Sequence, residues 1–434
     1  MSSSNLLLQN GRIIDPANNI DEPGDILIQG GKIAGREKCG SLSPPEGTTI
    51  VDLKGSWLLP GLIDIHVHLR EPGEEYKETI ASGTKAAAAG GFTAVACMPN
   101  TRPVNDSQAI TALILAKAAQ EGFARVYPVG AISKNSQGTE LAEFGELKKA
   151  GVVAVSDDGR PVANSQLMRR ALEYSGNHNL LVISHAEEMS LSINGVMNEG
   201  ALSTRLGLRG IPRVAEEIMI YRDLALAEYV NRPIHIAHIS TRESVELIRR
   251  AKAKGCKVTA ETTPHYFTLT EEAVGKYDTR AKMNPPLRTP GDVAAIIEGL
   301  ADGTIDAIAT DHAPHSEMEK DVEFDQAANG IIGLETSVPL TLALVRKNLL
   351  SPARMVELLS AGPARILGVT GGTLSVGSAA DITVVDPDKT FVYTKEQVVS
   401  KSSNSPFLNW ELTGKAVLTM VGGKITFSEL VGLG

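Results

Sequence analysis

Residues 60–365 contain eight short apolar runs, and longer stretches with helical spacing of apolar residues lie between them. This alternation is typical of strand–helix units around a parallel sheet, and eight such units close into a (β/α)8 barrel. The predicted strands are 62–66, 92–96, 125–131, 152–156, 180–185, 234–238, 257–261 and 306–310. We therefore predict an α/β protein whose main domain, residues 60–365, is a TIM-like barrel.

The two ends of the chain have a different pattern. Residues 1–59 and 366–434 alternate short apolar runs with turn signals such as Asn10-Gly11 and Gly422-Gly423, which favours β-hairpins. Because the ends of a domain often lie close together, we expect both ends to build one small β-sandwich domain.

Composition narrows the class of partner and the compartment. A formal net charge of -9 would repel polyanions, which argues against nucleic acid and against an anionic membrane surface. The three cysteines are far apart and form no Cys-x-x-Cys pair, so neither a disulfide framework nor a thiolate zinc site is indicated. The first residues have no leader pattern, and the sequence has no apolar run long enough for a membrane span. We expect a cytoplasmic protein.

Residues with metal-binding side chains fall at the ends of the predicted strands, where a barrel places its active site. His66 and His68 end the first strand, and residues two apart on an extended chain point the same way, so both imidazoles can bind one ion. The remaining candidates at or just after strand ends are Asp157, Asp158, His185, His238, Asp311, His312 and His315. This coincidence predicts a metal centre.

For other polar residues, the pattern favours a structural role or leaves a structural role and a place in the site as alternatives. His178 lies in a helix-to-strand connection and His235 has the wrong spacing to face the site, so we expect both to be structural. His265, after the seventh strand, is compatible with either a structural role or a place in the site. Asn100 and Asn284 stand beside rigid prolines after strands two and seven, which suits substrate positioning, although an ordinary turn also explains each.

Seven short motifs occur in chain order at these strand ends. They are His-Val-His-Leu-Arg-Glu-Pro-Gly (66–73), Met-Pro-Asn-Thr (98–101), Ser-Asp-Asp-Gly (156–159), His-Ala-Glu (185–187), His-Ile-Ser (238–240), Met-Asn-Pro-Pro-Leu-Arg (283–288) and Thr-Asp-His-Ala-Pro-His (310–315). Together they resemble the amidohydrolase superfamily, and most closely its bacterial class I dihydroorotase branch. The resemblance covers nearly the whole chain.

The resemblance implies a site for one or two Zn2+ ions. The implied ligands are His66, His68 and Asp311 for one ion and His185 and His238 for the other. Many relatives bridge the two ions with a carboxylated lysine at the end of strand four, where this sequence has no lysine. In the class I branch an aspartate takes this role, and Asp158 matches its position, with Asp157 as the alternative.

The activity implied by the resemblance is the reversible cyclisation of N-carbamoyl-L-aspartate to L-dihydroorotate in pyrimidine biosynthesis. Asp311 would act as the general base. Arg70 matches the family's carboxylate clamp, since a guanidinium binds a carboxylate bidentately. The other implied substrate contacts are His68, Asn100, Asn284, His315, Asn329 and Gly330. The polar segment 316–330 is compatible with a mobile lid and equally with a disordered surface loop.

Two other functions remain open at this point. One is another cyclic amidase: Arg70 argues against the uncharged substrates of dihydropyrimidinase and hydantoinase, because a desolvated arginine without its carboxylate is unfavourable, but it does not exclude allantoinase. The other is a non-catalytic dihydroorotase-like partner of aspartate carbamoyltransferase. Such proteins typically lose metal ligands, which are all present here. The resemblance is compatible with a homodimer and with a complex with that carbamoyltransferase.

Overall fold

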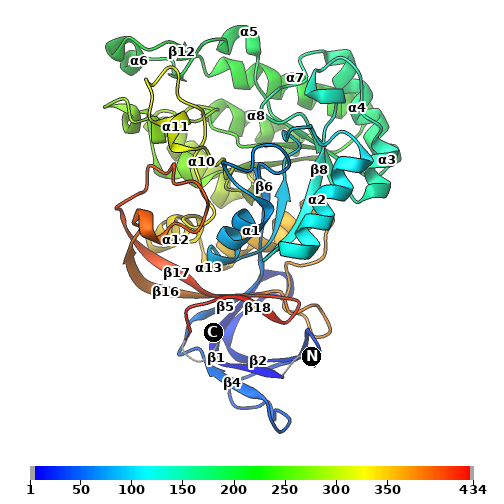
Figure 1. Cartoon of the computed structure of the whole chain (residues 1–434), viewed down its shortest axis with the longest axis vertical. Helices are drawn as coiled ribbons and strands as arrows, with labels where there is room; N and C mark the ends of the chain where they lie inside the picture. The colour runs from blue at the N-terminus through cyan, green and yellow to red at the C-terminus, as the bar shows by residue number, and fades with distance from the viewer. Residues whose placement is uncertain (1–4, 431–434) are drawn as a thin grey trace.

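The computed structural model describes residues 5–430, and two eight-stranded sheets organise it (Figure 1). The strands of the first sheet are β6 (Leu62–Val67), β7 (Phe92–Cys97), β8 (Arg125–Gly130), β9 (Ala154–Ser156), β10 (Leu181–Ser184), β13 (Ile234–Ile236), β14 (Val258–Thr262) and β15 (Ala307–Ile308). Neighbours in this order pair in parallel. The ring of strands closes where Val67 of β6 forms a parallel bridge with His312, four residues beyond the end of β15. The predicted (β/α)8 barrel is therefore confirmed.

Helices surround the barrel and bury one side against its strands. In α4, for example, Met168, Ala171, Leu172 and Ser175 are buried at helical spacing. The main helices are α1 (Ile80–Ala89), α2 (Gln108–Glu121), α3 (Phe144–Ala150), α4 (Ser165–Asn177), α7 (Val214–Val230), α8 (Arg242–Ala253), α10 (Pro290–Asp302), α12 (Ser337–Arg346), α13 (Pro352–Val356) and α14 (Gly362–Leu367). Between residues 5 and 430, no helix combines the length and the apolar character needed to cross a membrane.

Shorter elements fill the connections. They are the helices α5 (Met189–Ser192), α6 (Ala201–Leu206), α9 (Pro264–Thr268) and α11 (Glu317–Lys320), the paired strands β11 (Met197–Asn198) and β12 (Gly210–Ile211), the 3-10 turns η1 (Pro16–Asn18), η2 (Lys134–Ser136), η3 (Glu271–Val274), η4 (Thr279–Ala281) and η6 (Lys395–Gln397), and the π-helical turn η5 (Glu357–Ala361).

The second sheet combines both ends of the chain, as predicted. Its strands are β1 (Leu6–Asp15), β2 (Ile20–Gln29), β3 (Lys32–Glu37), β4 (Thr49–Asp52), β5 (Trp57–Pro60), β16 (Ile382–Val392), β17 (Glu411–Val421) and β18 (Lys424–Ser428). The strand β5 pairs antiparallel with β16, with Leu58 opposite Val384, and this pairing joins the two ends. An apolar cluster that includes Leu8, Ile26 and Ile382 is its core. In Figure 1 this small β domain lies below the barrel.

Several barrel strands end earlier than the sequence predicts. The sixth was expected to reach residue 238 and the eighth residue 310, whereas β13 ends at Ile236 and β15 at Ile308. The backbone leaves the extended conformation just beyond, with φ of 32° at His238 and 46° at Asp311. These residues therefore lie in turns at the carboxyl end of the barrel, which aim their side chains inwards.

Candidate metal centre

Six buried side chains converge at the carboxyl ends of the barrel strands. They form three overlapping groups, each with possible ligand atoms within 4.8 Å of one another: His66, His238 and Asp311; His66, His68 and Asp158; Asp158, His185 and His238. All six are the residues that the sequence singled out as ligands. The structure thus brings together side chains that lie up to 245 positions apart in the sequence, His66 and Asp311 being the most distant.

Asp158 lies at the centre of this cluster. Its Oδ1 is 3.4 Å from His66 Nε2, 3.4 Å from His185 Nδ1 and 3.5 Å from His238 Nε2, and its Oδ2 is 3.5 Å from His68 Nε2. Burial opposes its ionisation, but the neighbouring histidines, His66 first, hold the pKa of Asp158 well below its ordinary value. One carboxylate therefore contacts histidines from both implied ligand groups.

Asp157, the alternative to Asp158, points elsewhere. Its Oδ1 accepts hydrogen bonds from the backbone N–H groups of Ile132 and Ser133 at 2.8 and 3.0 Å, and its Oδ2 accepts one from the Ser133 hydroxyl. Both oxygens are thus occupied in holding the loop that follows β8. The geometry distinguishes the two aspartates, which the sequence alone left as alternatives.

The cluster contains buried polar atoms that the protein itself does not satisfy. Within residues 5–430, His66 Nε2, His238 Nδ1 and Asp158 Oδ1 have no hydrogen-bond partner, although all three are inaccessible to solvent. Buried polar atoms are rarely left without a partner, because their desolvation is then uncompensated. Imidazole nitrogens and carboxylate oxygens are ligands that zinc accepts. The donor set therefore fits a metal centre.

Other side chains fix the orientation of the histidine rings. His66 Nδ1 lies 2.6 Å from Glu261 Oε1, and His235 Nε2 lies 3.1 Å from Glu261 Oε2. Because a carboxylate can only accept, the contact places the proton of His66 on Nδ1 and leaves Nε2 free for an ion. Burial raises the pKa of Glu261, but its contacts with His66 and His235 outweigh burial and lower that pKa. His185 Nε2 likewise lies 3.2 Å from Glu187 Oε2.

Neither of these two glutamates was predicted as a site residue. Glu261 ends the predicted seventh strand, the same kind of position that carries ligands on other strands, and this is the signal that could have identified it. His235, expected to be structural, contacts Glu261 and so supports His66 indirectly. His265 is buried beside Tyr266 and belongs to none of the three ligand groups found in the described residues.

A positively charged side chain borders the metal cluster on one side. Arg70 is 9% exposed, its Nε donates to the Pro314 carbonyl at 3.1 Å, and its Nη2 lies 3.2 Å from His315 Nε2. Burial and the charge of Arg70 lower the pKa of His315 to about 2, so this imidazole is neutral and accepts from the guanidinium. Asn100 contacts the metal cluster itself: its Oδ1 lies 2.8 Å from His68 Nδ1 and its Nδ2 donates to Asp158 Oδ2 at 3.3 Å.

A cavity of about 230 Å³ connects the metal cluster with Arg70. Its lining includes Asn284 and Asn329, two of the residues implied to hold the substrate ring. Gly330, also implied, directs its N–H to the Lys282 carbonyl at 3.0 Å instead. The segment 316–330 contains α11, and Lys320 ties it down by donating to the carbonyls of Thr279, Lys282 and Ala328. Its mobility stays a prediction.

Comparisons with known proteins agree on one family. Residues 55–244 match a family model described as Dihydro-orotase-like. The chain is 58% identical over 425 residues to a protein named dihydroorotase from Geobacter metallireducens, covering 98% of this chain and 100% of the relative. It is 57% identical over 423 residues to a dihydroorotase from Pelobacter propionicus, covering 98% and 99% of the two chains.

Solved structures agree on the fold. The L-hydantoinase (dihydropyrimidinase) from Arthrobacter aurescens superposes with a TM-score of 0.87 at 26% identity, covering 98% of this chain and 96% of that one. A dihydropyrimidinase from Brevibacillus agri has a TM-score of 0.85 at 22% identity, covering 99% and 97%. The shared barrel and split β domain, together with the full-length identity to named relatives, lead to one conclusion: this chain belongs to the dihydroorotase family.

Proposed function

We propose that the protein catalyses the reversible, zinc-dependent cyclisation of N-carbamoyl-L-aspartate to L-dihydroorotate, as a class I dihydroorotase. The observation that carries the proposal is that one cavity is lined both by five of the six candidate ligands, all but His66, and by Arg70. Such a cavity accepts a cyclic amide whose ring carries a carboxylate. The full-length relatives named dihydroorotase support it.

The chain offers ligands for two zinc ions. His66, His68 and Asp311 would hold one ion, since Asp311 Oδ1 lies 3.0 Å from His68 Nε2 and 3.6 Å from His66 Nε2. His185 and His238 would hold the other, with Asp158 between the two groups. When bound, zinc supplies a water acidic enough to react near neutral pH and polarises the amide carbonyl.

Asp311 would move the proton. It lies in a turn at the end of the last strand, and its side chain lines the cavity. Burial raises the pKa of Asp311, but His66 and His68 outweigh burial and lower that pKa. The carboxylate is therefore ionised near neutral pH and able to accept a proton. In hydrolysis it would take the proton from the attacking water and pass it to the departing ring nitrogen. In cyclisation it would take the proton of the ureido nitrogen as the ring C–N bond forms and pass it to the carboxyl oxygen that leaves as water.

Arg70 would bind the substrate carboxylate, which does not react. A planar guanidinium matches a carboxylate with two parallel hydrogen bonds, and burial strengthens the pair. Asn100 and His315 border the same part of the cavity. Asn284 and Asn329 line the cavity and would contact the ring. His68 contributes to both the metal and the substrate sides.

The other candidate functions are less well supported. Allantoinase and other cyclic amidases share the ligand cluster, but the full-length Geobacter and Pelobacter relatives are named dihydroorotase. A non-catalytic partner of aspartate carbamoyltransferase has no need of six converging ligands. A homodimer, a complex with that carbamoyltransferase and a cytoplasmic location remain predictions from the resemblance.

Hydrolysis of L-dihydroorotate by the purified protein, followed by the loss of ring-amide absorbance with zinc measured on the same sample, tests the proposal. We expect turnover that a chelator abolishes and that zinc restores. Bound metal with no turnover of L-dihydroorotate would redirect the assignment to allantoin or hydantoins. A protein that neither binds zinc nor turns over substrate would point to the scaffolding role.

A further inference from the structure

One residue of the small β domain reaches the substrate side of the barrel. Asn404 lies in the connection 393–410 between β16 and β17, which rises beside α12 towards the barrel loops (Figure 1). It is 5% exposed, and both polar atoms of its side chain are hydrogen-bonded. The Oδ1 accepts from the His315 N–H at 3.0 Å, and the Nδ2 donates to the carbonyls of Ala313 at 2.9 Å and Gly330 at 3.0 Å.

These three contacts fasten two loops that line the substrate cavity. Ala313 and His315 flank Pro314, whose carbonyl accepts the hydrogen bond from Arg70 Nε. His315 also accepts from the Arg70 guanidinium through its ring. Gly330 follows Asn329, which lines the cavity. Both of the acceptors that orient Arg70 are therefore held in place by a single amide side chain.

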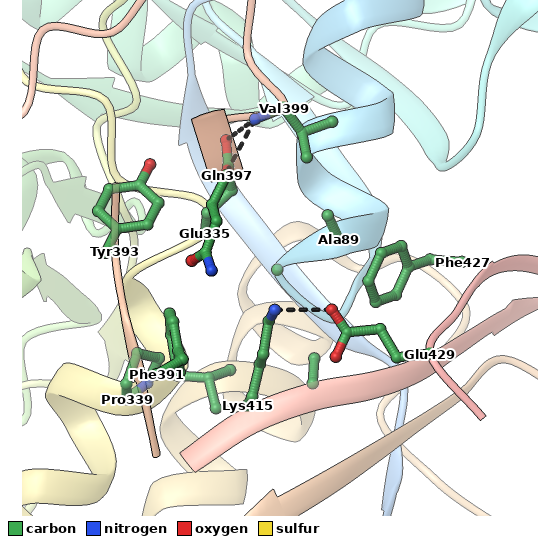
Figure 2. Close-up of a pocket in the computed structure, with 13 residues that line it drawn as sticks. Ala89, Glu335, Pro339, Phe391, Tyr393, Gln397, Val399, Lys415, Phe427 and Glu429 are labelled. Carbon is green, nitrogen blue, oxygen red and sulfur yellow. Dashed lines mark hydrogen bonds and ion pairs between the residues drawn. The ribbon is translucent and has the colours of Figure 1, made fainter. Parts of the chain in front are cut away.

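The chain around Asn404 is itself firmly held. We call residues 399–404 the bracing segment. It begins where Glu335 accepts from the Val399 N–H at 3.0 and 3.1 Å, a contact drawn in Figure 2, and from the Ser400 N–H at 3.1 Å. Further along, the carboxylate of Glu78 accepts from the Ser400 hydroxyl and from the Lys401 N–H, the latter at 3.2 Å. Asn404 thus extends from a fixed backbone, so its amide can impose a position on the loops that it contacts.

We propose that Asn404 is a positioning residue: it sets the direction of the Arg70 guanidinium and thereby the preference of the site for substrates that carry a carboxylate. The proposal rests on the proposed function for the identity of that substrate. The bracing of the two loops by Asn404 does not depend on the proposed function and can be measured separately. Asn404 is neither one of the six ligands nor a residue of the cavity lining, so its effect should reach the substrate only through Arg70 and the loops.

Two variants and one control test the proposal on the zinc-loaded full chain. Asn404→Ala removes all three contacts, whereas Asn404→Asp keeps the shape and the Oδ1 acceptor but turns an oxygen towards the carbonyls of Ala313 and Gly330. Ser402→Ala is the matched control, because it removes one buried hydrogen bond from the same bracing segment without touching either loop.

We expect both Asn404 variants to raise the KM for L-dihydroorotate about tenfold or more, because a guanidinium that is no longer held in position binds the substrate carboxylate less well. The kcat and the zinc content should stay close to those of the unmodified protein. Affinity for orotate, a planar ring that keeps the carboxylate, should fall by a similar factor, while affinity for uracil, which lacks it, should not change. Ser402→Ala should leave all of these values unaltered.

The proposal is overturned if the Asn404 variants bind orotate as tightly as the unmodified protein, or if orotate and uracil lose affinity equally. Hydrogen exchange provides a readout that does not depend on the activity: in Asn404→Ala, amides of 313–316 and 329–332 should exchange faster, and in Ser402→Ala they should not. Unchanged exchange in Asn404→Ala would remove the bracing role. Failure of the unmodified protein to turn over L-dihydroorotate would instead contradict the proposed function, and exchange would still decide whether Asn404 braces the loops.

Discussion

The Nδ1 atom of His66 lies 2.6 Å from Oε1 of Glu261, and Nε2 on the other side of the same ring faces Asp158. The ring is thus held by a carboxylate outside the ligand cluster while its free nitrogen points into it. Such contacts fix the tautomer and the angle of a metal-binding histidine, and their loss typically weakens metal binding by about 10- to 100-fold.

Glu261→Gln should therefore weaken zinc binding by about tenfold or more, because a neutral amide orients the imidazole less strongly than a carboxylate. Competition with a chromophoric chelator measures this affinity. Glu335→Gln is a suitable control, since Glu335 is a half-buried glutamate that contacts Val399 and Ser400 and none of the six ligands. Equal zinc affinity in Glu261→Gln and the unmodified protein would show that Glu261 has no such role.

Arg70→Met should lower kcat/KM for L-dihydroorotate by about a hundredfold or more, because a buried, bidentate charge pair with the substrate is lost. The zinc content should not change, since Arg70 is not among the ligands. Steady-state kinetics and metal analysis on one preparation check both statements. Turnover like that of the unmodified protein would exclude Arg70 as the carboxylate clamp.

Asp311→Asn should abolish turnover while weakening the binding of at most one of the proposed zinc ions. An amide can still contact an ion through its oxygen, but it cannot accept the proton from the attacking water. Zinc content and single-turnover kinetics separate the two effects. If the variant retained substantial activity, another group would have to be the general base.

The stability of the protein should depend on pH through Glu335. Burial raises its pKa to about 7, against opposing hydrogen bonds from Ser400 and Val399, and the usual value for an unfolded glutamate is about 4.5. The folded state therefore binds more protons than the unfolded state between these values, so this contribution to stability is present below pH 4.5 and is lost as the pH rises through 7.

Glu335→Gln should remove that contribution to the pH dependence, which we expect to amount to about 2 kcal/mol between pH 5 and 8. Urea unfolding of both proteins at several pH values gives the difference directly. The variant should lose less stability on going from pH 5 to pH 8 than the unmodified protein. A constant difference between the two across this range would contradict the raised pKa.

The fold and most of the ligand cluster could be predicted from the sequence because both follow from local patterns. Each barrel strand is a short apolar run, and each ligand stands at or just after the end of one. The choice between Asp157 and Asp158 could not be made locally, since it depends on the turn that sends Asp157 to Ile132 and Ser133.

Contacts between residues far apart in the chain could not be predicted from local sequence patterns either. Glu261 contacts His66 across 195 positions, and Asn404 contacts His315 across 89. No motif marks Asn404, because an asparagine in a polar connection usually indicates only a turn. The early ends of β13 and β15 were missed as well. His and Asp adopt a positive φ more often than most residues but still rarely, so His238 and Asp311 do not by themselves mark a turn.

The pairing of β5 with β16 affects the order in which the molecule can be assembled during translation. The strand β5 ends at Pro60, just before the barrel begins at Leu62, yet its partner starts only at Ile382. All six candidate ligands have therefore been synthesised, with about 70 residues still to be added, before β16 can pair with the strand that leads into the barrel. A chain that ended before residue 382 would contain all six candidate ligands and would still lack β16, the strand that pairs with β5 just before the first barrel strand.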